Sequence, residues 1–114
     1  MLSVTGYRLM LWTQPTDMRI GAHGLSGIVC NEMKEDPFLG GTIYIFFGAR
    51  RTTVKMIVWD IDGFAMYYKR LSRGTFGMPV YDPATKAMVI ERKDLQMILE
   101  GIEIRYRKRY ARPA

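Results

Sequence analysis

Asp60 and Asp62 are the side chains of this sequence best suited to metal-dependent phosphoryl chemistry. Such chemistry needs several carboxylates that converge on one or two metal ions. These two residues lie just before Gly63 in a segment predicted to form a tight turn, where aspartate is favoured because it hydrogen-bonds to the local backbone. We therefore expect the pair to be structural, and a metal-dependent nuclease is the third hypothesis for function.

The other potentially reactive residues lack the partner residues that catalysis or metal binding would need. His23 is the only histidine and Cys30 the only cysteine, so one chain has neither an internal disulfide nor a His/Cys metal set. Ser26 lacks the Gly-x-Ser-x-Gly context of a hydrolase nucleophile, because Ile28 occupies the position of the last glycine. No P-loop or dinucleotide-binding glycine pattern occurs. The sequence predicts a non-enzymatic protein with no metal and no cofactor.

Positive charge is concentrated at the C-terminus. The 114 residues carry a net charge of +6, and residues 104–114 contain five basic side chains and no acidic one, leaving 12 basic and 11 acidic residues elsewhere. Such an arm suits DNA or another polyanion, because each neutralised phosphate releases condensed counterions; a solvated tail that aids solubility is the alternative. The arm's candidate nucleic-acid contacts are Arg105, Arg107, Lys108, Arg109 and Arg112.

A predicted β-hairpin carries the second basic region. Strand-like runs at 54–60 and 64–71 are joined by a turn at which Gly63 is expected to supply a positive φ. The register that we expect sets Lys55 near Lys69, Ile57 near Tyr67 and Trp59 near Ala65, and a slip of one residue would exchange the two faces. The candidates are Arg50, Arg51, Lys55, Lys69, Arg70 and Arg73 for phosphates, with Trp59 and Tyr67 for stacked bases. Burial of both aromatic rings under a helix is the alternative.

The elements that position these residues follow from hydrophobic periodicity and turn signals. Strands are expected at 7–12, 42–47 and 87–90, and helices at 17–33, capped by Thr16, and at 92–101. A single apolar stripe should run along the first helix through Met18, Ala22, Leu25, Val29 and Met33. We expect an α+β fold in which a small antiparallel β-meander of three to five strands packs with two helices. Residues 1–103 would form one domain and residues 104–114 a basic arm.

An ordered series of short motifs resembles the TnpB accessory proteins of IS66-family bacterial insertion sequences. The motifs are Asp17-Met18-Arg19, Gly21, Gly24-Leu25, Asp36-Pro37-Phe38, Phe46 to Arg51, Lys55, Trp59-Asp60, Gly63, Lys69-Arg70-Leu71, Gly74, Phe76, Pro79, Leu95, Leu99 and Glu100-Gly101-Ile102. They span almost the whole chain, which departs from the family pattern at Ile20, His23, Ser72 and Met78.

The resemblance implies a role in transposition as an accessory factor beside a separate, larger transposase. The leading hypothesis is a DNA-binding accessory protein that contacts phosphates through the arm and the hairpin. The second hypothesis is a protein-interaction module that bridges or regulates the transposase without touching DNA. With no signal peptide and no apolar run long enough to span a membrane, the expected location is the cytoplasm. The oligomeric state is left open.

Overall fold

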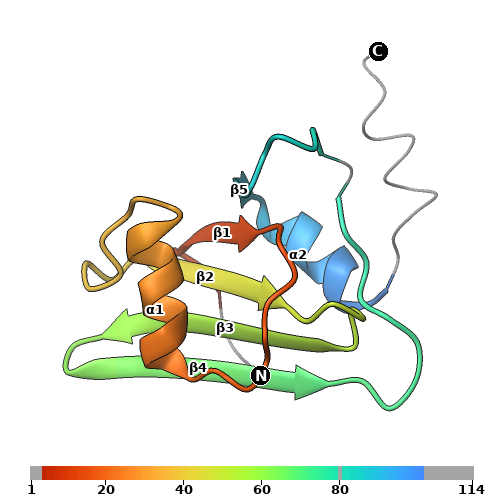
Figure 1. The fold of residues 1–114 in the computed structure, drawn as a ribbon, viewed down its shortest axis with the longest axis horizontal. Coiled ribbons are helices and arrows are strands. Elements are labelled where there is room, and N and C mark those ends of the chain that lie inside the picture. Colours follow the sequence, from red (N-terminus) through yellow and green to blue (C-terminus); the bar gives the residue numbers. More distant parts are fainter. Residues whose placement is uncertain (1–3, 80, 102–114) are drawn as a thin grey trace.

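The computed structural model describes residues 4–79 and 81–101, which form one five-stranded sheet and two helices (Figure 1). The strands lie in the order β4-β3-β2-β1-β5 across the sheet. In chain order the elements are β1 (Arg8–Trp12), α1 (Ala22–Asn31), β2 (Thr42–Phe47), β3 (Thr53–Asp60), β4 (Gly63–Arg70), β5 (Ala87–Ile90) and α2 (Arg92–Leu99). All five expected strands and both expected helices are present, and the α+β class is confirmed.

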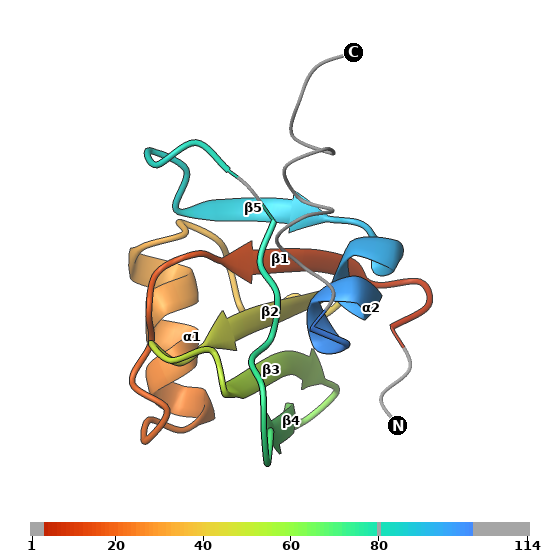
Figure 2. The ribbon, with the colours of Figure 1, turned by 90° about the vertical axis from the view of Figure 1, so that its right-hand side faces the viewer.

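The two helices cover opposite faces of the sheet (Figure 2). On the α1 face, Leu25 and Val29 of the helix are buried against a cluster that includes Met10, Tyr44 and Phe46. On the α2 face, Leu95 and Ile98 lie in a second cluster with inward side chains of β1, β2 and β3. Because the central strands carry apolar side chains on both faces, β2 is buried along nearly its whole length.

The sheet is mixed, which differs from the expected antiparallel arrangement. The meander of β2, β3 and β4 is antiparallel as predicted, and β5 is antiparallel to β1. However, β1 and β2 are parallel, with Arg8 opposite Thr42 and Leu11 opposite Ile45. The physical reason is the connection between them, because α1 crosses over one face of the sheet and returns the chain to the end where β1 began.

The first helix begins later and ends earlier than expected. It starts at Ala22 after Gly21, which provides no side-chain cap, and it ends at Asn31. Thr16 and Asp17 instead fold the preceding loop: the Thr16 hydroxyl donates to the Gln14 carbonyl, and Asp17 Oδ1 accepts from the Arg19 backbone N–H at 2.9 Å. A threonine-aspartate pair that resembles a helix cap can equally stabilise a turn.

The hairpin register differs by one residue from the expected register. Lys55 pairs with Tyr68, Met56 with Tyr67 and Trp59 with Phe64, so Asp60 and Gly63 close a two-residue turn. The positive φ in this turn belongs to Ile61, at 59°, and Gly63 is not in the left-handed region. The expected opposition of Lys55 and Lys69 is therefore wrong, and these two side chains lie on opposite faces of the sheet.

Candidate nucleic-acid interface

The corrected register brings a different set of hairpin side chains together. Thr53, Lys55, Tyr68 and Arg70 share the α1 face at the end of the sheet where β3 begins and β4 ends. The helix does not cover this end. The loop before α1 lies there instead, tied to the strands by the bond from the Thr16 N–H to the Phe47 carbonyl at 3.0 Å.

An open hollow of about 360 Å³ lies between this loop and the hairpin. We call it the basic groove. Its lining residues are Thr16, Met18, Arg19, Gly48, Ala49, Arg50, Thr52, Thr53, Tyr68 and Arg70. Three of them are arginines and none is acidic, so the groove offers guanidinium groups, threonine side chains and one tyrosine ring to a ligand.

The backbone of the β2–β3 loop positions Arg50. Gly48 donates to the Thr53 carbonyl at 3.1 Å and Arg51 donates to the Gly48 carbonyl at 3.0 Å, which tightens the loop around Arg50. Arg51 has a φ of 61°, a left-handed conformation that reverses the chain here. At Gly48, a Cβ atom would lie 2.6 Å from Thr53 Oγ1 and 3.0 Å from Met18 Cγ, so a larger residue would displace these two side chains, which line the groove.

Lys55 has a structural contact beneath the groove. Its ammonium donates to the Ile20 carbonyl at 2.9 Å and lies 5.4 Å from the centroid of the Tyr68 ring. The first contact fastens the loop before α1 to β3, and the second holds a cation beside an exposed aromatic face. Tyr68 is 51% exposed. The sequence reading identified Lys55 but missed Tyr68, because that residue reaches the groove only in the corrected register.

Arg19 and Asp17 form an ion pair at the rim of the groove. Arg19 Nη2 lies 2.8 Å from Asp17 Oδ2. The hydrogen bonds from Arg19 lower the pKa of Asp17 to about 2, so this carboxylate stays charged and offsets much of the Arg19 charge. Within residues 4–79 and 81–101, Arg50 and Arg70 make no ion pair. These two are therefore the groove's free cations.

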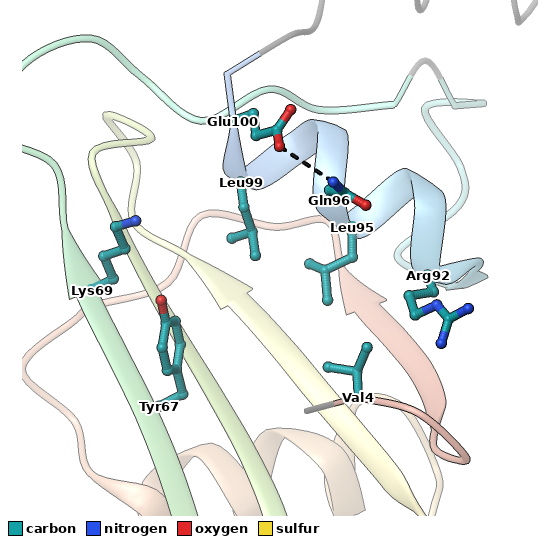
Figure 3. A pocket seen from close by; sticks show the side chains of 8 residues that line it. All are labelled: Val4, Tyr67, Lys69, Arg92, Leu95, Gln96, Leu99 and Glu100. Atoms are coloured by element: carbon teal, nitrogen blue, oxygen red, sulfur yellow. Dashed lines mark hydrogen bonds between the residues drawn. The ribbon is translucent and has the colours of Figure 1, made fainter. Parts of the chain in front are cut away.

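Tyr67 and Lys69 lie on the other face of the sheet. They line a separate hollow of about 270 Å³ with Val4, with Arg92, Leu95, Gln96 and Leu99 of α2, and with Glu100 directly after that helix. Figure 3 shows the Tyr67 ring and the Lys69 side chain on the side of β4 that faces α2. Tyr67 also packs against the α2-face core. The structure therefore separates Tyr67 and Lys69 from Arg50 and Arg70.

Trp59 lies at the far end of the hairpin from the basic groove. Its ring makes edge contacts with Phe38, at 5.2 Å between centroids, and with Phe64, at 5.1 Å. Three apolar side chains in this region are strongly exposed: Phe38 of the cluster itself at 56%, Leu39 after it at 79%, and Ile61 in the β3–β4 turn at 90%. We call Phe38, Leu39 and Ile61 the apolar tip. No sequence signal distinguished it, since its exposure depends on the turn geometry.

The remaining predicted contacts divide between the described and the undescribed parts of the chain. Arg73 is exposed in the loop after β4, and Arg51 is half-buried beside a smaller hollow on the other side of the β2–β3 loop. Arg105, Arg107, Lys108, Arg109 and Arg112 lie outside the described residues. Their grouping with the hairpin arginines remains a prediction.

The carboxylates do not assemble a metal centre in the described residues. Asp60 and Asp62 are exposed in the β3–β4 turn, and no group of three or more potential ligands occurs within residues 4–79 and 81–101. In the same part of the chain, neither helix has the length and apolar character needed to cross a membrane.

Comparison with known proteins identifies the family to which this chain belongs. Residues 7–109 match the family described as IS66 Orf2 like protein. The uncharacterized protein y4jC of Sinorhizobium fredii is 30% identical over 98 residues, covering 86% of this chain and 81% of that protein. The uncharacterized protein y4hO of the same organism is 32% identical over 111 residues, covering 96% and 94% respectively. No solved structure matches the chain. The chain therefore belongs to the IS66 Orf2-like family and has an accessory role associated with insertion sequences.

Proposed function

We propose that this protein is a non-catalytic accessory factor of transposition that binds DNA phosphates through the basic groove. The observation that carries the proposal is the convergence of Arg50 and Arg70 in a hollow whose lining contains no carboxylate. Family membership supports a role in transposition, and the basic groove supports DNA binding as the way in which the protein would contribute to it. The action would take place in the cytoplasm, where the DNA of a bacterial element lies.

The chemistry of the groove fits a nucleic-acid backbone. A guanidinium donates two parallel hydrogen bonds to a phosphate, and threonine hydroxyls are common additional donors to phosphate oxygens. The exposed ring of Tyr68 lines the groove together with Arg50 and Arg70, and an unpaired base could stack on it. Contacts of this kind position a protein on DNA without reading much sequence, so we expect modest sequence preference.

The proposal includes the rest of the predicted basic set in a secondary role. The C-terminal arm would add phosphate contacts, and Arg51 and Arg73 would extend the positive surface around the β2–β3 loop. Lys69 faces α2 and Lys55 is bonded to the Ile20 carbonyl, so both would contribute long-range attraction more than direct contact.

Equilibrium binding to a short duplex between 50 and 200 mM salt tests this function. Each phosphate contact contributes a slope of about −0.9 to the logarithm of the affinity against the logarithm of the salt concentration. We expect a slope steeper than about −3 for the full chain and a shallower slope after deletion of residues 104–114. Affinity that is flat across this range, or unchanged by the deletion, would contradict the proposal.

The non-catalytic part of the proposal has its own test. Asp60 and Asp62 are the best-placed carboxylates for metal-dependent hydrolysis, yet both lie exposed in a turn. We expect no cleavage of DNA with magnesium or manganese. Metal-dependent cleavage that disappears in Asp60→Ala would establish the nuclease hypothesis instead.

The second candidate function is docking to the transposase, and the apolar tip specifically favours it. Phe38 contacts Trp59, and Leu39 and Ile61 lie close to these two residues in the chain; all three apolar side chains are exposed, at the end of the hairpin away from the basic groove. Exposed apolar groups that gather in one place mark interaction surfaces. A bridging factor would use both ends, so this function is compatible with DNA binding.

Co-purification with the transposase of the same element tests this second function. The complex should survive high salt and nuclease treatment, and it should be lost with Leu39→Asp or Ile61→Asp. Val89→Asp is the control, because Val89 is an exposed apolar residue, at 57%, on β5 and outside the apolar tip. Equal loss in the control, or survival in both tip variants, would refute docking at the apolar tip.

A further inference from the structure

β4 is a long and exposed edge of the sheet. It pairs with β3 along one side, and within the described residues no strand pairs with its other side. Ala65, Met66, Tyr68, Lys69 and Arg70 are all exposed. The opposite edge strand, β5, is four residues long, whereas β4 has eight. An exposed edge with apolar side chains is a template for pairing with another strand.

The charges at the two ends of this edge have opposite signs. Asp60 and Asp62 lie at the turn that begins β4, while Lys69 and Arg70 lie at its end. All four side chains are exposed. If two copies of β4 paired in antiparallel order, the acidic end of each would lie beside the basic end of the other. Parallel pairing would bring like charges together, which is unfavourable.

We propose that a second copy of this chain pairs with β4 in antiparallel order, giving a symmetric dimer with one continuous sheet. The two-fold axis would pass perpendicular to the sheet near Met66 or Tyr67. Residues of the same parity then share a face, so Tyr68 of one copy lies opposite Phe64 or Met66 of the other. An isologous interface of this kind buries the same surface of both copies.

The self-complementary arrangement selects a second copy over an unrelated segment. An extended peptide of another protein would need to supply both a basic and an acidic end in the correct order, whereas β4 already supplies both. The symmetry also keeps α1 of both copies on the same side of the sheet. The two basic grooves would therefore open on that one side, with the two Arg70 residues roughly 20 to 27 Å apart along the strand direction. In the dimer without DNA, each Arg70 would lie near Asp62 of the other copy, and a DNA phosphate would replace that carboxylate as its partner.

The molar mass of the full chain in solution, measured by sedimentation equilibrium without DNA, tests the dimer. We expect twice the 13.2 kDa of one chain at tens of micromolar protein. Met66→Lys should weaken dimerisation at least tenfold, because it places two added charges near the axis. Val89→Lys on β5 is the matched control and should leave the dimer intact. A monomeric native chain, or a dimer weakened by Val89→Lys and not by Met66→Lys, would overturn the proposal.

A charge exchange provides the decisive variants, since it changes only exposed residues. Asp62→Lys and Arg70→Glu should each weaken the dimer severalfold, and the double variant should recover it, because Asp62 of one copy and Arg70 of the other share a face beside the seam. Circular dichroism checks that each variant is folded. Because no DNA is present, failure of this test would leave the proposed function standing. Single variants with native mass, or a double variant weaker than both singles, would refute antiparallel pairing of β4.

Discussion

Replacing Lys55 with methionine separates a structural role of this lysine from a role in DNA contact. The Lys55 ammonium donates to the Ile20 carbonyl at 2.9 Å and lies 5.4 Å from the Tyr68 ring centroid. Methionine keeps most of the apolar stem and removes both interactions. A hydrogen bond from a charged donor contributes about 1.5–3 kcal/mol, and solvent access at this half-buried site reduces that figure. We therefore expect the free energy of unfolding to fall by about 1–3 kcal/mol.

Urea unfolding followed by far-ultraviolet circular dichroism measures this change, together with a fall in Tm of at least about 4 °C. Lys86→Met is the matched control, because it removes the same charge from an exposed position beside β5 and should change stability by less than about 0.5 kcal/mol. The DNA salt slope of Lys55→Met should stay within about 0.5 of the native value. Native stability combined with a slope reduced by about 1 would refute the structural role and make Lys55 a phosphate contact.

The other predictions concern titration and a backbone constraint. The hydrogen bond from Arg8 holds the pKa of Glu35 below its ordinary value. The ion pair therefore stabilises the native state above a pH of about 4.3, and this stabilisation is lost as the pH falls further. Glu35→Gln should make the free energy of unfolding, measured by urea titration, less dependent on pH in this acidic range. Burial and a hydrogen bond to Glu35 raise the pKa of Tyr44 to about 12. The neutral phenol therefore contributes its full stabilisation of the native state below pH 10, and this contribution disappears toward pH 12. Tyr44→Phe should remove the tyrosinate absorbance step that occurs at the highest pH. Gly101 has a φ of 74° and an added Cβ would lie 2.9 Å from the Thr75 carbonyl oxygen, so Gly101→Ala should lower Tm by several degrees in thermal melts, and an unchanged Tm would contradict the close approach.

The strands and the second helix were predictable because their signals are local. Alternating or continuous apolar runs marked β1 to β5 to within a residue or two. Residues 92–101 were predicted as a helix from their apolar positions; the helix ends at Leu99, and the capping box between Glu91 and Asp94 provides its start. The parallel pairing of β1 and β2 was not foreseen, since pairing depends on where the intervening helix packs.

The hairpin register could not be fixed from residue types alone. Asp60-Ile61-Asp62-Gly63 suggests a turn in which glycine takes the positive φ, yet the structure gives that conformation to Ile61. A shift of one residue moved Lys69 and Tyr67 to the α2 face and brought Tyr68 to the basic groove. The positive charge of the hairpin could therefore be predicted from the sequence, whereas the residues that line the basic groove could be identified only from the structure.

The contribution of Arg50 and Arg70 to the salt dependence of DNA binding tests the central claim most directly. Fluorescence anisotropy with a labelled duplex between 50 and 200 mM salt would compare the native chain with Arg50→Gln/Arg70→Gln and with a control of equal charge change, Lys86→Gln/Arg92→Gln, outside the groove. Loss of two phosphate contacts predicts a slope shallower by about 1.8 for the groove variant and by less than about 0.5 for the control. Equal slopes for the two double variants would contradict a phosphate site in the basic groove.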